Sequence, residues 1–452
     1  MRGNLSQYWR CPESYLRIAL AGELSGEKGY FRFGPDTLYG RCVKARPAAE
    51  AAEPLLDLRD GARLEAGTVL LPFDFDEVVD NLRQELYVGD NAWGDRLTDA
   101  YYLLRPALPV AVRKHLQRLR LRKWEEIPFP HWPVDRTVDD LMEKALALLM
   151  QAGDVRQIPF IWFWPDGAPS CALMTHDVET EAGVELCSKL MDIDEAFGIP
   201  ASFQVVPEER YQVQPAFLDS LRSRGYEVVV HDLNHDGYLF RSRRHFAERV
   251  SKINAYGKQF GATGFRAGIL YRNQSWFDLL DFEYDMSVPN VAHLDPQRGG
   301  CCTVMPYFVG KILELPVTTT QDYSVFHILG DYSTKLWERQ IEMIMEKHGL
   351  ISVIAHPDYL AGEREKSLYE ALLGHLTQLR ASRQLWIATP GEVNRWWRQR
   401  AEMEIVEVNG KLQIEGPGKE RAQIAYATEC DGRLEFDRQP VVRQVSASYC
   451  PS

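Results

Sequence analysis

Two histidines at metal-ligand spacing are the first candidates for chemistry in this sequence. His231 and His235 follow the apolar run EVVV, in the segment HDLNHDG. On a helical turn, residues four apart share one face, so both imidazoles could grip one metal ion. With 11 histidines in 452 residues, chance gives about 0.3 such pairs, so the pair gains weight only from its place after an apolar run. The alternative is two surface histidines on a loop.

Two carboxylates follow another apolar run, CALMT, in the segment HDVE. Asp177 and Glu179 are two residues apart, and in a strand their side chains point to the same side. One can bind a metal while the other takes a proton from a metal-bound water. Two histidines and one carboxylate form a three-ligand set that leaves positions open for water and substrate, as in catalytic zinc sites. Either carboxylate alone would be an ordinary acidic loop residue.

Two further polar residues stand at the ends of apolar runs. Arg266 follows GF and suits a clamp that orients a carboxylate. His356 follows LISVIA, and a histidine there is a natural general acid. Folds that alternate strands and helices place their sites at the C-terminal ends of the strands. The matching positions of these residues therefore indicate one common site.

The elements that would position these residues lie between about 168 and 400. Apolar runs alternate there with helical segments, several of which end in glycine, so we expect a parallel sheet covered on both faces or a closed β/α barrel. Residues 1–165 read as a mixed α/β accessory region, in which the run 134–150 predicts a helix capped by Thr137. Residues 402–452 alternate around VNGK and CDGR turns and read as a small β appendage.

The composition bounds the class of function. Net charge is 52 − 64 = −12, which argues against a general nucleic-acid binder but not against a sugar enzyme. We find no signal peptide and no apolar stretch long enough for a membrane span. Eight scattered cysteines without a CxxC pair make a zinc ribbon unexpected and favour reduced thiols, hence a cytoplasmic location. The oligomeric state is left open.

One stretch departs from this acidic balance. Residues 105–123 hold seven basic side chains and no acidic one. A basic amphipathic helix can lie on an anionic membrane or hold a phosphate-bearing substrate. The more common alternative is a solvated face that packs on the acidic remainder of the protein.

The order of these motifs resembles the polysaccharide deacetylase family (NodB-homology, carbohydrate esterase family four) over about 168–400. THDVE is similar to its first motif, HDLNHDG to its histidine-pair motif, GFRAGILYR to its arginine motif and LISVIAHPDY to its last, histidine-bearing motif. YDMSVPN and WIATPGEVNRWW resemble two further segments. The resemblance implies a distorted (β/α) barrel of about seven strands and a hydrolase of acyl groups, mostly N-acetyl groups on sugars.

The resemblance also implies roles. It makes Asp177 the catalytic base, His231 and His235 metal ligands, Arg266 the residue that holds the base, and His356 the general acid. The metal would be a divalent ion, zinc in the first place, with cobalt or nickel as alternatives.

The sequence departs from the family at two motifs. Val178 stands where the family has its metal-binding aspartate, and Glu179 fits the D-x-D/E variant of the intracellular, peptidoglycan-deacetylase-like branch, which makes Glu179 the expected third ligand. In the arginine motif, Ala267 and Gly268 stand where a proline is usual. Either Asp322 or Asp285 could orient His356, and Asp322 is preferred.

The implied reaction is metal-assisted hydrolysis. The metal would polarise the acyl carbonyl, with a backbone N–H near Tyr271 as a further oxyanion donor. Four residues are candidates for substrate binding, with packing as the alternative: Tyr271, Trp276, His293 and Asp295.

Three functions therefore stay open. The first is a deacetylase of a sugar or glycan precursor in envelope or exopolysaccharide synthesis, the pathway resting on family analogy. The second is hydrolysis of another non-peptide C–N bond, in a formamide or ureide-like substrate. The third is a catalytically weak module for carbohydrate binding or assembly, because the usual ligand aspartate is displaced.

Overall fold

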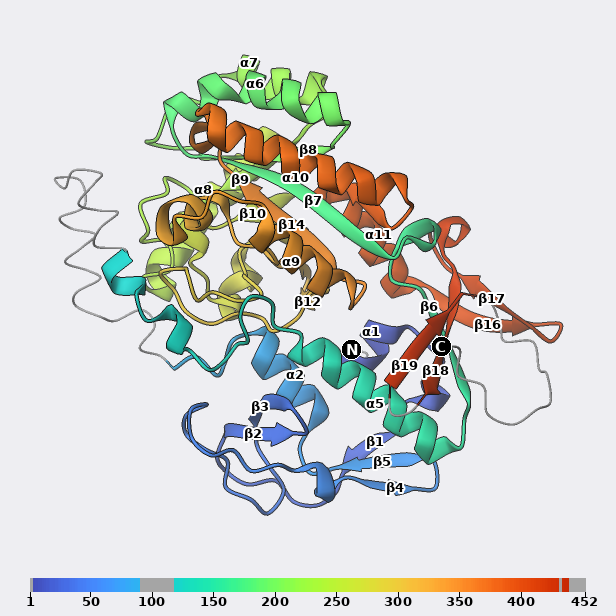
Figure 1. The fold of residues 1–452 in the computed structure, drawn as a ribbon. Coiled ribbons are helices and arrows are strands. Elements are labelled where there is room, and N and C mark those ends of the chain that lie inside the picture. Colours follow the sequence, from blue (N-terminus) through green and yellow to red (C-terminus); the bar gives the residue numbers. More distant parts are fainter. Residues whose placement is uncertain (1–2, 90–117, 431–432, 439–452) are drawn as a thin grey trace. The chain divides into compact units, whose positions relative to one another are not determined.

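The computed structural model describes residues 3–89, 118–430 and 433–438 (Figure 1). By its contacts the chain forms two compact units. Gln84–Arg136 and Pro169–Arg395 make one, called the barrel unit below; Met1–Arg83, Thr137–Ala168 and Trp396–Ser452 make the other, called the three-segment unit. The predicted division into residues 1–165, 168–400 and 402–452 stays a prediction.

A nine-stranded sheet forms the centre of the barrel unit. Its strand order is β12-β13-β11-β10-β9-β8-β7-β14, and β15 also pairs with β7. Every pairing is parallel except the β12–β13 hairpin. The strands are β7 (Ser170–Val178), β8 (Ala201–Val205), β9 (Glu227–His231), β10 (Gly264–Arg266), β11 (Tyr284–Asp285), β12 (Tyr307–Val309), β13 (Ile312–Glu314), β14 (Leu350–Ala355) and β15 (Leu385–Ala388). The expected mixed α/β class with a mainly parallel sheet is confirmed.

The chain that follows β13 brings the two ends of this sheet together. The hydroxyl Oγ1 of Thr318 donates to the carbonyl of Leu350 at 2.7 Å, and Oγ1 of Thr319 donates to the carbonyl of Ser352 at 2.8 Å. These carbonyls belong to β14, at the other end of the strand order. The sheet is therefore curled, and side-chain hydroxyl groups span the gap where a regular strand ladder would otherwise close it.

Strand β7 pairs with three other strands of the barrel unit. All nine of its residues are buried, which explains its nearly continuous apolar sequence. It pairs with β14 along one edge, and along the other edge with β15 at its start and with β8 at its end. Because the carboxyl ends of parallel strands meet at one edge of a sheet, the polar residues that end β7, β9, β10 and β14 collect there.

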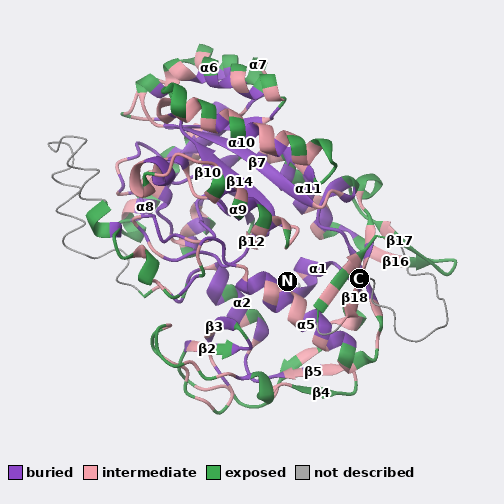
Figure 2. Ribbon diagram, in the orientation of Figure 1, coloured by how far each residue is buried: buried purple, intermediate pink, exposed green. Residues whose placement is uncertain are grey.

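Helices cover the sheet, and local sequence sets their ends. Thr180 caps the first turn of α6 by accepting the N–H of Gly183, and Ser242 does the same for α8 through His245. Gly198 and Gly261 end these helices in the left-handed conformation, as the glycine pattern predicts. Figure 2 shows β7 and β14 buried and the outer faces of α6 and α7 exposed. The helices are α6 (Glu181–Phe197), α7 (Pro215–Ser223), α8 (Arg243–Phe260), α9 (Lys335–Met345) and α10 (Glu363–Ala381). The next helix, α11 (Pro390–Glu402), begins in the barrel unit and continues into the three-segment unit.

The three-segment unit combines the two ends of the chain. Its strand β18 pairs antiparallel with β6, so the C-terminal β segment continues a sheet that begins before the barrel. The predicted helix over 134–150 is present as α5, which begins at Thr137. Its elements are α1 (Asn4–Trp9), α2 (Phe75–Arg83), α5 (Thr137–Gly153), β1 (Ile18–Leu20), β2 (Gly29–Phe33), β3 (Asp36–Gly40), β4 (Arg63–Glu65), β5 (Thr68–Leu71), β6 (Gln157–Ile161), β16 (Glu404–Val408), β17 (Lys411–Glu415), β18 (Ile424–Cys430) and β19 (Arg433–Asp437).

Two sequence-based expectations concern membranes. Within the described parts of the chain, no helix has both the length and the apolar character that crossing a bilayer requires. Of the basic stretch 105–123, residues 105–117 lie outside the described residues, and 118–121 are helical. Contact of that stretch with a membrane surface stays a prediction.

Candidate metal centre

Six of the predicted site residues meet at the carboxyl edge of the sheet. Asp177 is the last but one residue of β7, and Glu179 is the first residue after that strand. His231 ends β9, Arg266 ends β10, and His356 follows β14 directly. His235 joins them from the loop that follows His231. Neighbouring parallel strands thus bring together residues that are far apart in the sequence.

One oxygen of Glu179 lies at the centre of three imidazoles. Its Oε1 is 2.9 Å from Nε2 of His235, 3.7 Å from Nε2 of His231 and 3.5 Å from Nε2 of His356. Burial raises the pKa of Glu179, but the histidines around it hold the pKa well below its ordinary value, so the group is ionised. Glu179, His231 and His235 offer ligand atoms within 4.8 Å of one another, and Asp177, Glu179 and His356 form an overlapping set.

The two histidines of the pair hold nitrogens that the described residues leave unsatisfied. Nε2 of His231 and both ring nitrogens of His235 are buried, and among these residues none forms a well-oriented hydrogen bond with them, although Oε1 of Glu179 lies 2.9 Å from Nε2 of His235. The other nitrogen of His231, Nδ1, lies 3.1 Å from the carbonyl of Arg266, which can only accept. Nδ1 therefore carries the proton, and the lone pair of Nε2 points toward the carboxylates, as in a metal-ligating histidine.

A proton and a metal ion would compete for Nε2 of His231. Burial lowers its pKa, but the Asp177 and Glu179 carboxylates raise the pKa above its ordinary value. Metal binding to this nitrogen must therefore release a proton in the range where His231 would otherwise be charged. The donor set of two imidazoles and one carboxylate fits a divalent transition metal such as zinc.

The loop that carries His235 is not the helical turn that the spacing suggested. Asp232 and His235 both take left-handed backbone angles, with φ of 57° and 52°. The Asp232 carboxylate accepts the N–H groups of Leu233 and Gly268, and Arg249 binds Asp236 through two hydrogen bonds of 2.8 and 2.6 Å. Such strained residues persist at sites where their surroundings hold them. The left-handed backbone of this loop, rather than a helical turn, thus brings the imidazole of His235 beside that of His231.

Asp177 is held as a carboxylate by Arg266. Nη1 of Arg266 donates to Oδ1 of Asp177 at 2.6 Å and to Oγ1 of Thr175 at 2.9 Å, and its Nε donates to the carbonyl of Met286. Burial raises the pKa of Asp177, but Arg266 and the nearby histidines lower the pKa below its ordinary value. Oδ2 lies 3.7 Å from Nε2 of His231. One oxygen is thus anchored and the other faces the candidate metal centre.

His356 is paired with Asp322. Nδ1 of His356 lies 2.6 Å from Oδ1 of Asp322, and the backbone N–H of His356 donates to Oδ2 at 2.7 Å. Burial lowers the pKa of His356, but Asp322 and Glu179 raise the pKa well above its ordinary value, so the imidazole keeps a proton near neutral pH. Asp285, the alternative partner in the sequence, instead accepts the N–H and hydroxyl of Ser287.

Sequence reasoning missed the residues that fix the backbone around the site. The hydroxyl of Tyr211 donates to the carbonyl of Val178 at 2.7 Å, and Nε of Arg210 donates to the carbonyl of Glu179 at 2.9 Å. A Cβ on Gly268 would stand 2.8 Å from the ring of His235 and 2.5 Å from Oδ2 of Asp232. Only the glycine in GFRAG gave a local signal, because the other contacts depend on folded loops.

None of the four candidates for substrate binding belongs to the groups of possible metal ligands among the described residues. Tyr271 is buried, and its N–H donates to the carbonyl of Gly268 at 3.2 Å, so this N–H already has an acceptor. Trp276 lies against Phe240 and Phe246, with ring centroids 5.9 and 5.7 Å away. The roles predicted for both residues stay predictions.

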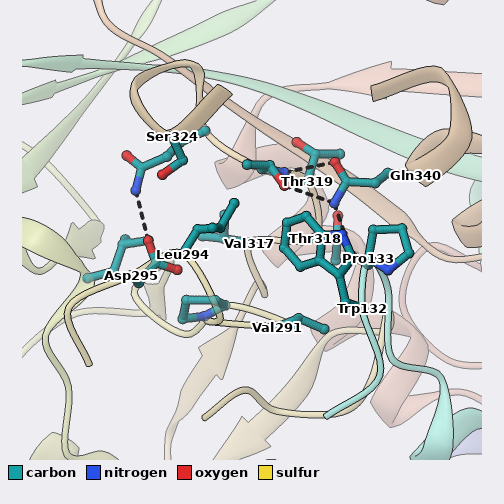
Figure 3. Close-up of a pocket in the computed structure, with 14 residues that line it drawn as sticks. Trp132, Pro133, Val291, Leu294, Asp295, Val317, Thr318, Thr319, Ser324 and Gln340 are labelled. Atoms are coloured by element: carbon teal, nitrogen blue, oxygen red, sulfur yellow. Dashed lines mark hydrogen bonds between the residues drawn. The ribbon is translucent and has the colours of Figure 1, made fainter. Parts of the chain in front are cut away.

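Of the other two candidates, Asp295 lines a small cavity and His293 stacks on a residue that lines it. His293 is buried and stacks on Trp132 at 6.0 Å, and burial lowers its pKa to about 4. Asp295 accepts a hydrogen bond from Gln321 at 3.0 Å and lines the cavity drawn in Figure 3. The cavity has a volume of about 20 Å³, room for one water molecule but not for a sugar. In this conformation Asp295 lines a cavity too small for a sugar, and His293 stacks on Trp132, another residue of its lining. The substrate contacts predicted for both residues stay predictions.

No protein-family model and no curated protein matches the sequence. Solved structures match part of it. A Mycobacterium smegmatis protein assigned as a polysaccharide deacetylase is 17% identical, with a TM-score of 0.42, over 53% of this chain and 93% of its own. The allantoinase PuuE is 13% identical, with a TM-score of 0.42, over 52% of this chain and 92% of its own. Peptidoglycan deacetylase PdaC from Bacillus subtilis is 13% identical, with a TM-score of 0.32, over 51% of this chain and 93% of its own. These likenesses carry no argument about activity, which has to come from the site.

Proposed function

We propose that the protein is a metal-dependent hydrolase that removes an acyl group, N-acetyl in the first place, from a sugar or sugar-linked precursor. One observation carries the proposal. Buried imidazole nitrogens of His231 and His235 face the ionised Glu179 without forming a well-oriented hydrogen bond with any described residue, and they lie between the anchored Asp177 carboxylate and the anchored His356 imidazolium. If Glu179 and the histidines formed only a structural ion pair, Asp177 would not need Arg266 and His356 would not need Asp322 to fix their positions.

Glu179, His231 and His235 would hold the ion. When bound, a divalent metal supplies Lewis-acid polarisation of the acyl carbonyl and a lowered pKa for bound water. Glu179 would thus replace the aspartate that Val178 displaces, as the resemblance to the D-x-D/E branch implies. Zinc remains the first expectation, with cobalt and nickel as alternatives.

Asp177 and His356 divide the proton transfers. Asp177 accepts a proton from the attacking water through Oδ2, because Arg266 occupies Oδ1 and keeps the group ionised. His356 donates from Nε2 to the leaving amine, because Asp322 holds Nδ1 and favours the charged ring. Such a base and acid give a bell-shaped pH profile.

The test is an acyl-release assay on the full chain with and without added zinc, cobalt or nickel. Its substrates are nucleotide-linked, lipid-linked and oligomeric N-acetyl sugars, and acetate, formate and ammonia are all measured. We expect metal-dependent acetate release. Formate or ammonia alone would assign the activity to another C–N bond, and a metal-loaded protein without any release would point to a binding or assembly module.

A matched pair of variants tests the ligand set. Glu179→Ala should lose bound metal and acetate release together, whereas Glu181→Ala, which removes an exposed carboxylate two residues further on, should keep both. Full metal content and activity in Glu179→Ala would overturn the proposed site. The cytoplasmic location and the part in envelope or exopolysaccharide synthesis remain sequence-based predictions.

A further inference from the structure

A second cavity of the barrel unit lies between the loop that follows β8 and the last turns of α8, and its volume is about 470 Å³. Cavities that bind small molecules in proteins commonly measure about 300–1,000 Å³, so this one has room for a ligand. Residues of the loop 207–213 form one wall, and Tyr256, Gln259 and Phe260 form the other. Because residues three and four apart share one face of a helix, α8 presents these three side chains to the cavity together.

Two residues of the loop wall also hold the chain where β7 ends. Nε of Arg210 donates to the carbonyl of Glu179 at 2.9 Å, and the hydroxyl of Tyr211 donates to the carbonyl of Val178 at 2.7 Å. The cavity therefore lies beside the backbone of the candidate metal ligand. None of its lining residues, however, belongs to the groups of possible metal ligands among the described residues. The cavity is thus a site separate from the metal centre.

Three aromatic side chains line the cavity, and the hydroxyl groups of the two tyrosines are already engaged. The hydroxyl of Tyr211 accepts the N–H of Val206 at 3.0 Å in addition to its bond to Val178. The hydroxyl of Tyr256 donates to Oε1 of Glu208 at 3.2 Å, and its ring lies 5.5 Å from the ring of Phe260. These side chains therefore offer a ligand mainly ring surface, whose negative face attracts polarised C–H groups.

The polar groups of the lining have hydrogen-bonding capacity left for a ligand. The side-chain amides of Gln212 and Gln259 are exposed and form no hydrogen bond with a described residue. Within the same part of the chain, the Arg210 side chain donates from Nε alone, so both of its Nη groups remain available. The lining contains one guanidinium and one carboxylate, that of Glu209, so its charges cancel. A neutral ligand with several hydroxyl groups suits this lining better than a multiply charged one.

We propose that this cavity, called the α8 cavity, binds a neutral pyranose ring of a glycan. A pyranose with equatorial hydroxyl groups has a face of C–H groups, which pack on aromatic rings, and an edge of hydroxyl groups, which bond to amides. The lining of the α8 cavity combines both kinds of partner in a space large enough for such a ring. The inference goes beyond the proposed function, because binding here requires neither a metal nor hydrolysis.

Neutral and charged trisaccharides test the α8 cavity. Cellotriose, which has no acyl group to release, and trigalacturonic acid, which carries a carboxylate on every ring, are titrated into the full chain by calorimetry. We expect cellotriose to bind and trigalacturonic acid to bind more weakly. Hydrogen–deuterium exchange locates the ligand, and cellotriose should protect residues 207–213 and 253–260 both with and without added zinc.

Variants of the two walls test the contacts. Gln212→Ala/Gln259→Ala should weaken cellotriose binding at least about fivefold, because two amides lose their hydrogen bonds to the sugar. Tyr256→Leu should weaken binding to a similar extent because it removes the ring, whereas Tyr256→Phe keeps the ring and should lose much less. The control, Gln378→Ala/Gln384→Ala, removes two exposed amides on and after α10 and should bind cellotriose as the wild type does.

Four results would overturn the α8 cavity as a sugar site. They are no binding of cellotriose, equal binding by Gln212→Ala/Gln259→Ala and the wild type, protection confined to residues around the metal centre, and tighter binding of trigalacturonic acid. The last result would show that the cavity selects a charged ligand. A protein that binds cellotriose here but releases no acetate would keep the α8 cavity and count against the proposed function instead.

Discussion

Each residue that would take part in proton transfer or bind the metal has a buried partner that helps to set its protonation state or tautomer. Arg266 keeps Asp177 ionised, Asp322 keeps His356 charged, and the carbonyl of Arg266 fixes the tautomer of His231. These partners come from other strands or loops than the groups they orient. Acid–base roles at neutral pH thus depend on contacts of 2.6–3.1 Å that hold across the sheet.

Replacing the anchored carboxylate separates metal binding from turnover. Asp177→Asn keeps an oxygen for Arg266 but cannot take the proton from water, so we expect metal content to stay and kcat to fall about 10²–10⁴-fold. Metal analysis and acetate release on the same preparation measure both quantities. Undiminished kcat would remove Asp177 from the role of base.

A pair of carboxyl groups makes stability depend on pH. Asp285 and Glu314 are fully buried. Burial raises the pKa of Asp285, and burial together with the Asp285 charge raises the pKa of Glu314 well above its ordinary value. The folded state therefore holds their proton more tightly than the unfolded state. This stabilisation is complete below the ordinary carboxyl pKa of about 4.3 and is lost as the pH rises through the raised value.

Glu314→Gln should remove much of this dependence. Gln keeps the oxygen that accepts the N–H of Val288 and can donate to Asp285 without a titrating proton. We expect the wild-type free energy of unfolding to fall with rising pH above about 4.3 and that of Glu314→Gln to fall less steeply. Urea unfolding at several pH values measures both slopes. Parallel slopes for the two proteins would show that Glu314 does not take up the proton.

At the level of elements, the loops that follow the strands determine the geometry of the metal centre more than the strands do. The strands deliver residues to one edge, but the loop 232–238 and the turn after β10 decide where the second imidazole lies. Gly268 is the point at which these two connections touch, since its N–H binds Asp232 and its missing side chain leaves room for His235.

A side chain at Gly268 should therefore loosen the metal site. In Gly268→Ala, the new Cβ would displace the His235 ring, and we expect metal affinity to fall about 10–100-fold, as for other changes to groups that orient metal ligands. The control is Gly374→Ala in α10, where a Cβ meets only a ring carbon of Phe197 at 3.8 Å. This control should keep its metal and gain about 0.5–1 kcal/mol of stability. Competition with a chelating dye gives the affinities, and unchanged affinity in Gly268→Ala would contradict the proposed packing.

For the whole molecule, the segment 84–136 belongs to the barrel unit although it precedes the first strand by more than thirty residues. Glu85 and Arg272 form a buried ion pair, with Nε of Arg272 2.7 Å from Oε2, and Glu85 also accepts the N–H of Gly300. Tyr87 donates to the carbonyl of Gly300 at 2.6 Å. These contacts attach the segment to the loops beside the site.

Breaking this ion pair should cost much more than breaking an exposed one. Glu85→Gln leaves the buried charge of Arg272 uncompensated, and we expect a loss of about 3–5 kcal/mol in the free energy of unfolding. Glu126→Gln removes an exposed partner of Lys123 and should change stability by less than about 0.5 kcal/mol. Urea unfolding measures both, and similar small losses would show that the segment is not held through Arg272.

The fold was predictable where the pattern is local. Glycine stops and capping residues mark α6 and α8, and apolar runs mark β7 and β14, because helix ends and strand burial depend on neighbours in the sequence. The pairing of β18 with β6 was not predictable, since either strand can pair with any free edge. Nor was the link of Thr318 and Thr319 to β14, because hydroxyl groups carry no pairing signal.

The sequence by itself determined which chemical groups the site could contain. Asp177, Glu179, His231, His235, Arg266 and His356 each end a strand or follow one, and parallel strands place their carboxyl ends at one edge. Only the tertiary structure decided how they face one another: that Asp322 rather than Asp285 holds His356, that a strained loop rather than a helical turn carries His235, and that Arg118 reaches His327. The physical reason is that topology brings backbone ends together, whereas the choice of partner depends on distances of a few ångströms that packing alone sets.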